Sequence, residues 1–145
     1  FMNYTINPPN FKPEFNVVGI LVEFDGKIIL LHRNDSSPQG NRWGIPSGKV
    51  DKNETLIQAT ERELKEETNL SIKRLEIKYI KTYKVRHYPQ QDFIYNLFYV
   101  RLEKKERIKI NEKEHKDFKW IFPQKAIKLN LVPGTEICIN DFYKL

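Results

Sequence analysis

The hydrophobic pattern near the start of the chain predicts two β-strands. Residues 15–24 and 27–32 are rich in Val, Ile, Leu and Phe, as strands in a sheet core usually are. The Asp25-Gly26 pair between them is typical of a type I′ hairpin turn, because both central residues of that turn need a positive φ. We therefore expect an antiparallel hairpin in this region.

The clearest helical pattern covers residues 54–69. Apolar or small side chains recur there at helical spacing, at Leu56, Ala59, Thr60 and Leu64. Asn69 stands at the end of the pattern and tolerates the left-handed conformation that often ends a helix. Before this helix, residues 43–50 predict a short strand that Pro46 and Gly48 interrupt.

The second half of the chain predicts more strands and two further helices. The expected strands cover residues 72–88, 93–102 and 118–122, a charged connection covers 103–117, and the helices cover 123–129 and 135–145. This order indicates the α+β class, and we expect an α/β/α sandwich with a mixed sheet between helices. Three of the eight prolines fall in residues 1–14, so we expect an N-terminal arm there and one domain over residues 15–145.

Composition and charge narrow the class of protein and of partner. A chain of 145 residues with 39% hydrophobic residues can bury a real core, which excludes a disordered or disulfide-stapled chain. Lys and Arg number 25 against 19 for Asp and Glu, a net charge of +6. This sign favours an anionic partner such as a nucleotide, a nucleic acid or phosphate, and a solubilising surface is the alternative.

Cysteine use and hydropathy bear on the compartment. Cys138 is the single cysteine, which excludes an intrachain disulfide, and its apolar neighbours predict a small buried side chain. No stretch approaches 18 consecutive apolar residues, and the first residues lack the basic and apolar segments of a signal peptide. We expect a cytoplasmic protein without a membrane partner.

Three carboxylates share one face of the predicted central helix. Glu63, Glu66 and Glu67 stand at positions i, i+3 and i+4, a spacing at which like charges repel. A cluster of oxygen ligands suits Mg²⁺ or Mn²⁺. The alternative for the three glutamates alone is a solvated, Glu- and Lys-rich helix face.

The spacing around these glutamates matches a longer motif. Gly48, Glu54, Arg62-Glu63 and Glu66-Glu67 fit the pattern G-x5-E-x7-R-E-U-x-E-E-x-G-U, in which U is aliphatic. This pattern is the signature of the Nudix hydrolases, which the sequence strongly resembles over roughly residues 15–133. One position departs from it, because Asn69 stands where the family has Gly. Asn is the best substitute for a glycine with positive φ, so we expect the helix end to keep its geometry.

The resemblance implies a metal site and its supports. The implied principal ligands are Glu66 and Glu67, with Glu63 as a third, and the carbonyl of Ser47 and the side chain of Glu114 as further ligands. The alternatives to Glu114 in the same charged run are Glu112, Glu106 and Glu103. Arg62 would hold Glu63 by a charge-assisted hydrogen bond, and Gly48, Glu54 and Asn69 would have structural roles. Either Glu63 or Glu114 would remove the proton from the attacking water, and the residues leave both open.

Other residues are candidates for binding substrate. Arg33 and Lys49 could bind phosphates, with a solvated surface charge as the alternative for each. The aromatic residues that could stack on a base are Tyr83, Phe93, Tyr95 and Trp120. Most strand aromatics belong to the core, so we expect at most one or two of these in contact with substrate, and we expect Trp43 to pack. The histidines are expected to be structural, and they are His32, His87 and His115.

The implied activity is Mg²⁺- or Mn²⁺-dependent hydrolysis of a phosphoanhydride. We expect the substrate to be a small-molecule nucleotide, a nucleoside or deoxynucleoside triphosphate that gives the monophosphate and pyrophosphate. Dinucleoside polyphosphates, nucleotide sugars and RNA 5′ ends are alternatives, so nucleic acid is a possible but not favoured partner. A catalytically silent domain that binds nucleotide or RNA is an alternative from another class. Many relatives are dimers, which leaves a homodimer open.

Overall fold

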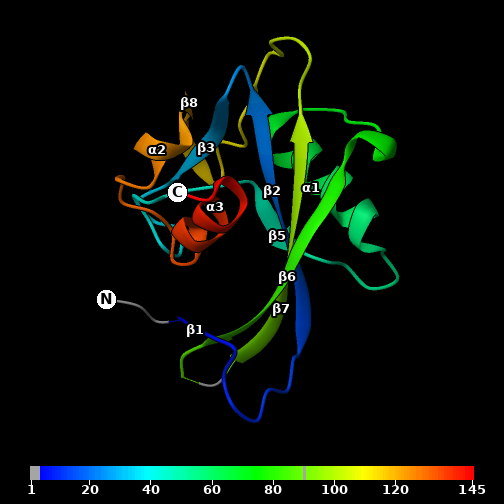
Figure 1. Ribbon diagram of the computed structural model, residues 1–145, viewed down its shortest axis with the longest axis vertical. Coiled ribbons are helices and arrows are strands. Elements are labelled where there is room, and N and C mark those ends of the chain that lie inside the picture. Colours follow the sequence, from blue (N-terminus) through cyan, green and yellow to red (C-terminus); the bar gives the residue numbers. More distant parts are fainter. Residues whose placement is uncertain (1–3, 90) are drawn as a thin grey trace.

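The computed structural model describes residues 4–89 and 91–145 (Figure 1). The strands are β1 (Tyr4–Ile6), β2 (Phe15–Phe24), β3 (Lys27–Arg33), β4 (Trp43–Gly44), β5 (Ser47–Lys49), β6 (Lys78–His87), β7 (Gln91–Arg101) and β8 (His115–Ile121). The helices are α1 (Leu56–Thr68), the short 3₁₀ helix η1 (Arg74–Glu76), α2 (Pro123–Ala126) and α3 (Thr135–Tyr143).

The strands form one mixed sheet between helices, which confirms the predicted fold class. The main strand order is β1-β6-β7-β2-β3-β4, with β5 paired to β2 and β8 paired to β3. Only the β2–β7 pairing is parallel among the described strands. Helices α1 and α3 lie on opposite sides of the sheet (Figure 1). The central strand β2 therefore contributes side chains to two separate cores.

The predicted hairpin between β2 and β3 is present. Asp25 and Gly26 have φ angles of 52° and 78°, the positive values that a type I′ turn needs. Residues 43–50 are divided into two short strands, β4 and β5, with Pro46 in the break between them, whereas Gly48 lies inside β5 and does not interrupt it. The local turn chemistry thus determines where this part of the sheet folds back.

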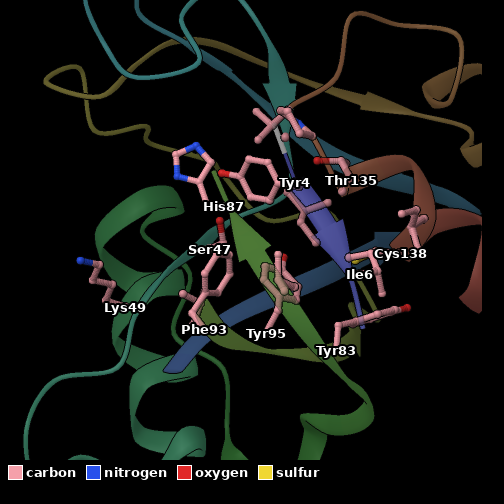
Figure 2. A pocket seen from close by; sticks show the side chains of 18 of the residues that line it. Tyr4, Ile6, Ser47, Lys49, Tyr83, His87, Phe93, Tyr95, Thr135 and Cys138 are labelled. Carbon is pink, nitrogen blue, oxygen red and sulfur yellow. The ribbon is translucent and has the colours of Figure 1, made fainter. Parts of the chain in front are cut away.

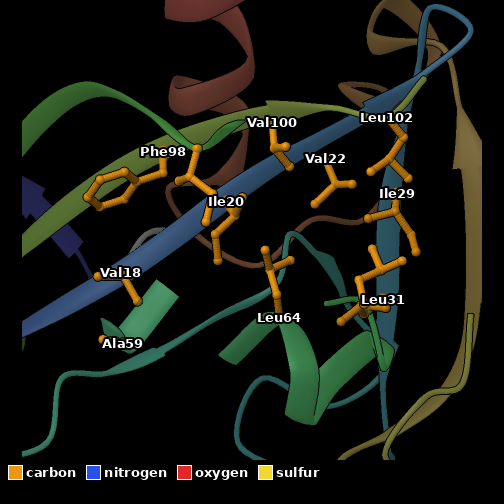
Figure 3. Close-up of a cluster of buried hydrophobic side chains, with 12 residues drawn as sticks. Val18, Ile20, Val22, Ile29, Leu31, Ala59, Leu64, Phe98, Val100 and Leu102 are labelled. Carbon is orange, nitrogen blue, oxygen red and sulfur yellow. The ribbon is translucent and has the colours of Figure 1, made fainter. Parts of the chain in front are cut away.

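The core on the α1 side follows the alternation of a strand. Val18, Ile20 and Val22 of β2 point to this face and are fully buried against Ala59 and Leu64 of α1 (Figure 3). Burying each such side chain contributes about 1.5–3 kcal/mol, so this contact holds α1 firmly on the sheet. The opposite face of β2 carries Leu21, which packs in the α3-side core with Ile139.

The second half of the chain differs from the predicted boundaries in several places. The strand expected over 72–88 begins only at Lys78, because residues 74–76 form η1. The last helix ends at Tyr143, since Lys144 adopts a left-handed conformation with φ of 56°. The connection 103–117 is irregular until β8 begins at His115, earlier than the predicted 118. Among the described residues, no helix combines the length and apolarity needed to cross a membrane.

The N-terminal segment takes part in the sheet. Tyr4–Ile6 forms β1 and pairs antiparallel with β6, whereas the sequence predicted only an arm over residues 1–14. Its residues 1–3 lie outside the described residues. The remainder is held against the β6–β7 hairpin, where Arg86 donates hydrogen bonds to the carbonyls of Pro9 and Asn10. This packing depends on partners about 80 positions away, which no local pattern reveals.

A partly buried ion pair anchors this segment and predicts a pH dependence of stability. Asp92 accepts hydrogen bonds from Arg86 at 2.6 and 3.0 Å and from the Lys12 backbone N–H at 2.8 Å. Arg86 lowers the pKa of Asp92 below its ordinary value. A lowered carboxyl pKa stabilises the fold above the unfolded-state pKa of about 3.9, and the contribution is lost as the pH falls through the folded-state pKa. Asp92→Asn should therefore lower the free energy of unfolding at pH 7 and much less at pH 3.

Chemical denaturation of both proteins at the two pH values measures this difference. Asp25→Asn is the matched control, because Asp25 lies in an exposed turn without an ion pair among the described residues. If the difference in free energy of unfolding between wild type and Asp92→Asn were as large at pH 3 as at pH 7, the ion pair would not be the cause of the effect.

Candidate active site

The helix that carries the acidic residues is closed at both ends by its own sequence. Thr55 is the N-cap, and its side chain and that of Gln58 form a reciprocal capping box. The helix therefore begins at Leu56, two residues after the predicted start. Asn69 ends it with a φ of 67°, and its N–H donates to the carbonyl of Lys65. The predicted left-handed conformation of Asn69 is confirmed.

Substitution of Asn69 should show that it acts as a helix terminator. Asn69→Gly is expected to leave activity within about threefold, because glycine adopts positive φ without strain. Asn69→Ala should lower the free energy of unfolding by about 1 kcal/mol, since a Cβ disfavours this conformation. Activity assays and thermal melts measure the two effects. A large change of activity in Asn69→Gly would show that the side chain has another role.

Two of the predicted metal ligands form a buried acidic pair. Glu63 and Glu67 lie one turn apart on the face of α1 toward β2 and β5, and are 7% and 4% exposed. Each carboxyl group shifts the pKa of the other, so the two lie close together. Glu67 Oε1 also accepts a long hydrogen bond, 3.4 Å, from the Ser47 backbone N–H. The helix thus brings two carboxylates and the Ser47 segment to one point.

Burial makes this acidic pair hard to ionise. Loss of solvent raises the pKa of Glu67 well above its ordinary value, and the neighbouring charges of Glu63 and Glu114 raise it further. Burial also raises the pKa of Glu63, but Arg62 partly offsets the effect. Among the described residues, no Lys, Arg or His forms an ion pair with Glu67. The pair therefore needs either a proton or another cation.

Gly48 makes room for the carboxyl group of Glu63. A Cβ atom at position 48 would lie 2.2 Å from Glu63 Cδ and Oε1, and 2.5 Å from Oε2. Such distances are far inside van der Waals contact, so any larger residue would displace the carboxylate. The glycine of the motif is needed here for close approach, since Gly48 is not among the glycines with positive φ.

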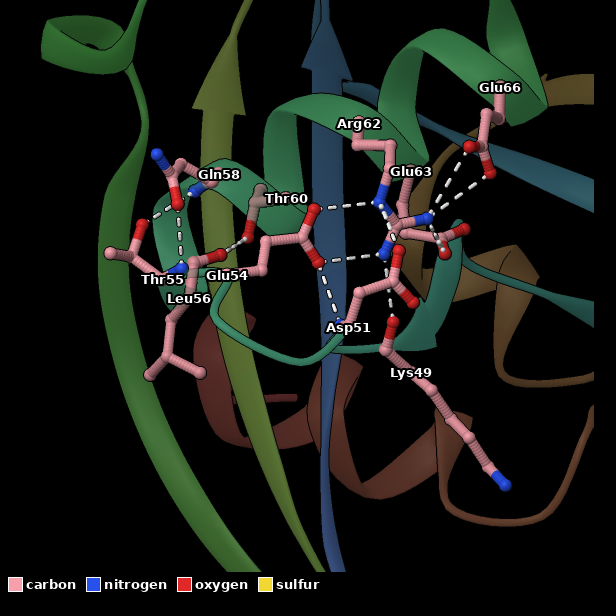
Figure 4. A network of polar contacts seen from close by, with 10 residues as sticks. All are labelled: Lys49, Asp51, Glu54, Thr55, Leu56, Gln58, Thr60, Arg62, Glu63 and Glu66. Atoms are coloured by element: carbon pink, nitrogen blue, oxygen red, sulfur yellow. Dashed lines mark hydrogen bonds and ion pairs between the residues drawn. The ribbon is translucent and has the colours of Figure 1, made fainter.

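Arg62 joins the motif into one network (Figure 4). Its guanidinium donates to Glu54 Oε2 at 2.7 Å and Oε1 at 3.0 Å, and to Glu63 Oε1 at 2.8 Å. It also donates to the carbonyl of Lys49 at 2.9 Å. Glu54 in turn accepts from the Asp51 N–H at 2.8 Å, which holds the loop before α1. Arg62 thereby ties the loop, β5 and the acidic pair together.

The remaining predicted ligands are near the pair but more exposed. The Glu66 side chain is 51% exposed and contacts Arg62 at 3.3 Å, and Glu114 is exposed and accepts from the Asn111 amide at 3.2 Å. Within residues 4–89 and 91–145, no three acidic, His or Cys side chains converge as a metal-binding group. Carboxylates repel one another, and Arg62 is the cation within reach of Glu66. The structure therefore assembles Glu63, Glu67 and Ser47, but not the full predicted set.

A cavity of about 290 Å³ opens next to Glu67 and Ser47 on the α3 side of the sheet (Figure 2). Its walls come mainly from β1, β6, β7, the segment before α3, and α3 itself. Its aromatic and apolar lining includes Tyr4, Phe15, Tyr83, Phe93 and Tyr95. The cavity thus joins an apolar chamber to an acidic edge, as small-molecule sites often do.

Both predicted phosphate-binding cations line this cavity. Arg33 donates from Nε to the carbonyl of Pro38 at 2.6 Å, and Lys49 places Nζ 4.3 Å from the ring centroid of Phe15. Each is therefore positioned by its own contact. Both lie in the cavity wall near the acidic edge, and their binding of phosphate stays a prediction.

Three of the four aromatic candidates lie in the cavity wall, and one does not. Tyr83, Phe93 and Tyr95 line the cavity. Trp120 packs edge-on against Phe24 in the core on the α1 side, so its interpretation as a base-stacking residue is wrong. The reason is the register of β8, which pairs Trp120 with Ile29 on the face opposite the cavity. Trp43 packs as expected, stacked on His32 at 4.1 Å.

Several lining residues were missed from the sequence. Tyr4 and Ile6 of β1, Thr135 and Ile137 of α3, and His87 all line the cavity. The alternation of Tyr4 and Ile6 was the only local signal for the β1 residues, and it is too short to define a strand. Cys138 is buried as predicted, and it also lines the cavity.

Comparison with known proteins identifies the family. The NUDIX domain matches residues 12–142 of the chain. The chain therefore belongs to the Nudix hydrolase family, as its motif indicated. The match begins at residue 12, within the predicted N-terminal arm.

Individual relatives differ in how much of the chain they match. RNA pyrophosphohydrolase of Campylobacter jejuni is 32% identical over 133 residues, which cover 79% of this chain and 80% of that protein. CTP pyrophosphohydrolase of Escherichia coli is 43% identical over 54 residues, 37% of this chain. The matched part of the chain spans only 40% of the length of that CTP pyrophosphohydrolase. The solved structure of the E. coli ORF135 protein has a TM-score of 0.76 and 26% identity, covering 92% of this chain and 91% of the other.

Proposed function

We propose that this protein hydrolyses a phosphoanhydride bond of a small nucleotide with the help of Mg²⁺ or Mn²⁺. The preferred substrate is a nucleoside or deoxynucleoside triphosphate, which gives the monophosphate and pyrophosphate. The observation that carries the proposal is the acidic pair of Glu63 and Glu67, buried at the edge of an aromatic-lined cavity. The single cysteine fits a reducing compartment, and we place the protein in the cytoplasm.

The residues at the acidic edge fit a hard divalent cation. Glu67 is buried without a cationic partner among the described residues, and it lies beside the Glu63 carboxyl group and the Ser47 backbone. Oxygen donors are the ligands that Mg²⁺ and Mn²⁺ prefer. Glu63, Glu67 and the Ser47 carbonyl would hold the ion, and Glu66 and Glu114 are the further candidates. When bound, the ion supplies charge that stabilises the phosphate oxygens and activates water.

The other residues position the substrate and the acidic groups. Arg62 holds Glu63 in place through its charge-assisted hydrogen bond, and Glu54 braces Arg62. Arg33 and Lys49 bind the phosphates at the mouth of the cavity. The nucleoside enters the aromatic chamber, where Phe93 lies stacked on Phe15 at 5.3 Å and Tyr83 lies beside Tyr95. Glu63 and Glu114 are the two candidates for accepting the proton of the attacking water.

A metal-supplemented nucleotide screen tests the proposal. The purified protein is incubated with Mg²⁺ or Mn²⁺ and each of the common ribo- and deoxyribonucleoside triphosphates, a dinucleoside tetraphosphate, a nucleotide sugar and a 5′-triphosphorylated RNA. Products are identified by mass spectrometry in heavy-oxygen water, which marks the phosphorus atom that the water attacked. We expect turnover of at least one mononucleotide, abolished by a chelator. Tight nucleotide binding without any turnover would instead support a silent binding domain.

RNA 5′ ends are the second candidate substrate. The C. jejuni relative named RNA pyrophosphohydrolase matches 79% of this chain, and the net charge of +6 suits a polyanion. Turnover of the triphosphorylated RNA at least about tenfold faster than that of every mononucleotide would favour this substrate.

A further inference from the structure

One tyrosine of the cavity lies over the backbone of a neighbouring strand. Tyr95 belongs to β7, and its ring extends across β2 above Gly19. A Cβ atom at position 19 would lie only 1.8 Å from the Tyr95 hydroxyl oxygen and 2.4 Å from Cζ. The absence of a side chain at Gly19 is therefore what allows this placement.

The Tyr95 hydroxyl has no hydrogen-bond partner among the residues that the structure describes. Two other tyrosines of this core differ, since Tyr83 donates to Asp141 and Tyr143 donates to Glu23, both at 2.7 Å. Because Tyr95 lines the cavity, its hydroxyl is available to pair with a molecule bound there. Burial raises the pKa of Tyr95 well above its ordinary value, which keeps the hydroxyl protonated and able to donate.

The position of this hydroxyl lies between the two parts of the site. Gly19 pairs with Ser47 in the β2–β5 ladder, and the Ser47 N–H donates to Glu67. Paired strands are about 4.8 Å apart, so the hydroxyl above Gly19 lies about one strand spacing from the Ser47 backbone. The ring of Tyr95 also borders the aromatic wall, because its centroid lies 6.3 Å from that of Tyr83 (Figure 2). In a nucleotide, the sugar is the part that lies between the base and the phosphates.

We propose that the Tyr95 hydroxyl hydrogen-bonds a sugar hydroxyl of the bound nucleotide, in a position that Gly19 makes possible. This inference rests on the proposed function and assigns a residue that binds the sugar. Tyr95 takes no part in bond breaking, so its removal should weaken binding and leave kcat nearly unchanged.

The test pairs removal of the enzyme hydroxyl with removal of each substrate hydroxyl. Wild type and Tyr95→Phe are compared with the preferred nucleoside monophosphate and its 2′-deoxy and 3′-deoxy analogues, and Kd is measured by calorimetry in Mg²⁺ buffer. We expect Tyr95→Phe to raise Kd for the ribonucleotide about 3- to 10-fold, the usual effect of losing one hydrogen bond. For wild type, the analogue that lacks the contacted sugar hydroxyl should have a Kd higher than that of the ribonucleotide by a similar factor. For Tyr95→Phe, the two Kd values should be almost equal. With the matching triphosphates, KM should rise while kcat stays within about twofold.

The matched control is Tyr99→Phe, which removes a hydroxyl from the same face of β7 outside the cavity, where Tyr99 packs on Phe142. It should bind all three ligands like wild type. The sugar contact would be overturned if wild type and Tyr95→Phe had equal Kd values, or if Tyr95→Phe bound all three ligands more weakly than wild type by the same factor. Either result would leave the proposed nucleotide hydrolysis standing. A wild-type protein that neither binds nor hydrolyses any nucleotide would overturn the proposed function and this inference with it.

Discussion

Replacing Glu67 by Gln is expected to lower kcat at least about 100-fold, because a carboxylate that holds a catalytic metal contributes several kcal/mol to transition-state stabilisation. The fold should not suffer. Glu67 is 4% exposed, and burial disfavours its charged form, so a neutral amide of the same shape should leave the free energy of unfolding equal or higher. Steady-state kinetics with Mg²⁺ and thermal melts of both proteins measure the two effects.

The control for this prediction lies on the same helix. Glu61 pairs with Arg74 at 2.7 Å, outside the acidic pair and the cavity, so Glu61→Gln should keep wild-type kcat. Its stability should change by at most about 1 kcal/mol, as is usual for a surface ion pair. Wild-type turnover in Glu67→Gln would remove the assignment of Glu67 to the metal site.

Placing a methyl group at position 48 is expected to give the second large effect. The Cβ of Gly48→Ala would lie 2.2 Å from the Glu63 carboxyl carbon, so that carboxylate has to move. The movement strains its contacts with Arg62 and Glu67. A displacement of about 1 Å in a catalytic group can cost about 100-fold in rate, and we expect kcat/KM to fall by about that factor.

The fold of Gly48→Ala should persist, because the clash involves the end of a side chain rather than backbone. Its circular dichroism spectrum should match wild type, and the melting temperature should fall by only a few degrees. A combined variant, Gly48→Ala with Glu67→Gln, should be little worse than Glu67→Gln alone, since both changes disable one site. If the double variant lost activity by the product of the two single losses, or if Gly48→Ala had normal activity, the assigned close approach of Gly48 to the Glu63 carboxylate would be contradicted.

The parts of the fold that could be predicted are those whose causes lie within a few residues. The Asp25-Gly26 turn follows from the φ values that the turn type requires, and the end of α1 at Asn69 follows from the same preference. The helix itself follows from apolar spacing. Boundaries shifted by a few residues where capping decided them, as Thr55 did at the start of α1.

The N-terminal segment shows the limit of this reasoning. Three prolines suggested an arm, yet Tyr4–Ile6 adds a strand to the sheet, and Asp92 and Arg86 hold the residues that follow. Trp120 shows the same limit in the site, because its aromatic character was visible but the face of the sheet was not. In both cases the deciding partner lies far away along the chain.

The amino-acid sequence by itself placed Glu63, Glu66 and Glu67 on one face of a helix, since residues three and four apart share a face whatever the helix packs against. Packing against the sheet decided that Glu63 and Glu67 are buried while Glu66 stays exposed. Only the tertiary structure decided the cavity, because the order β6-β7-β2 and the parallel pairing of β2 with β7 bring Tyr95 over Gly19. Strand order depends on which faces of the strands become buried in the folded protein. The pattern of neighbouring residues along the chain does not reveal that order.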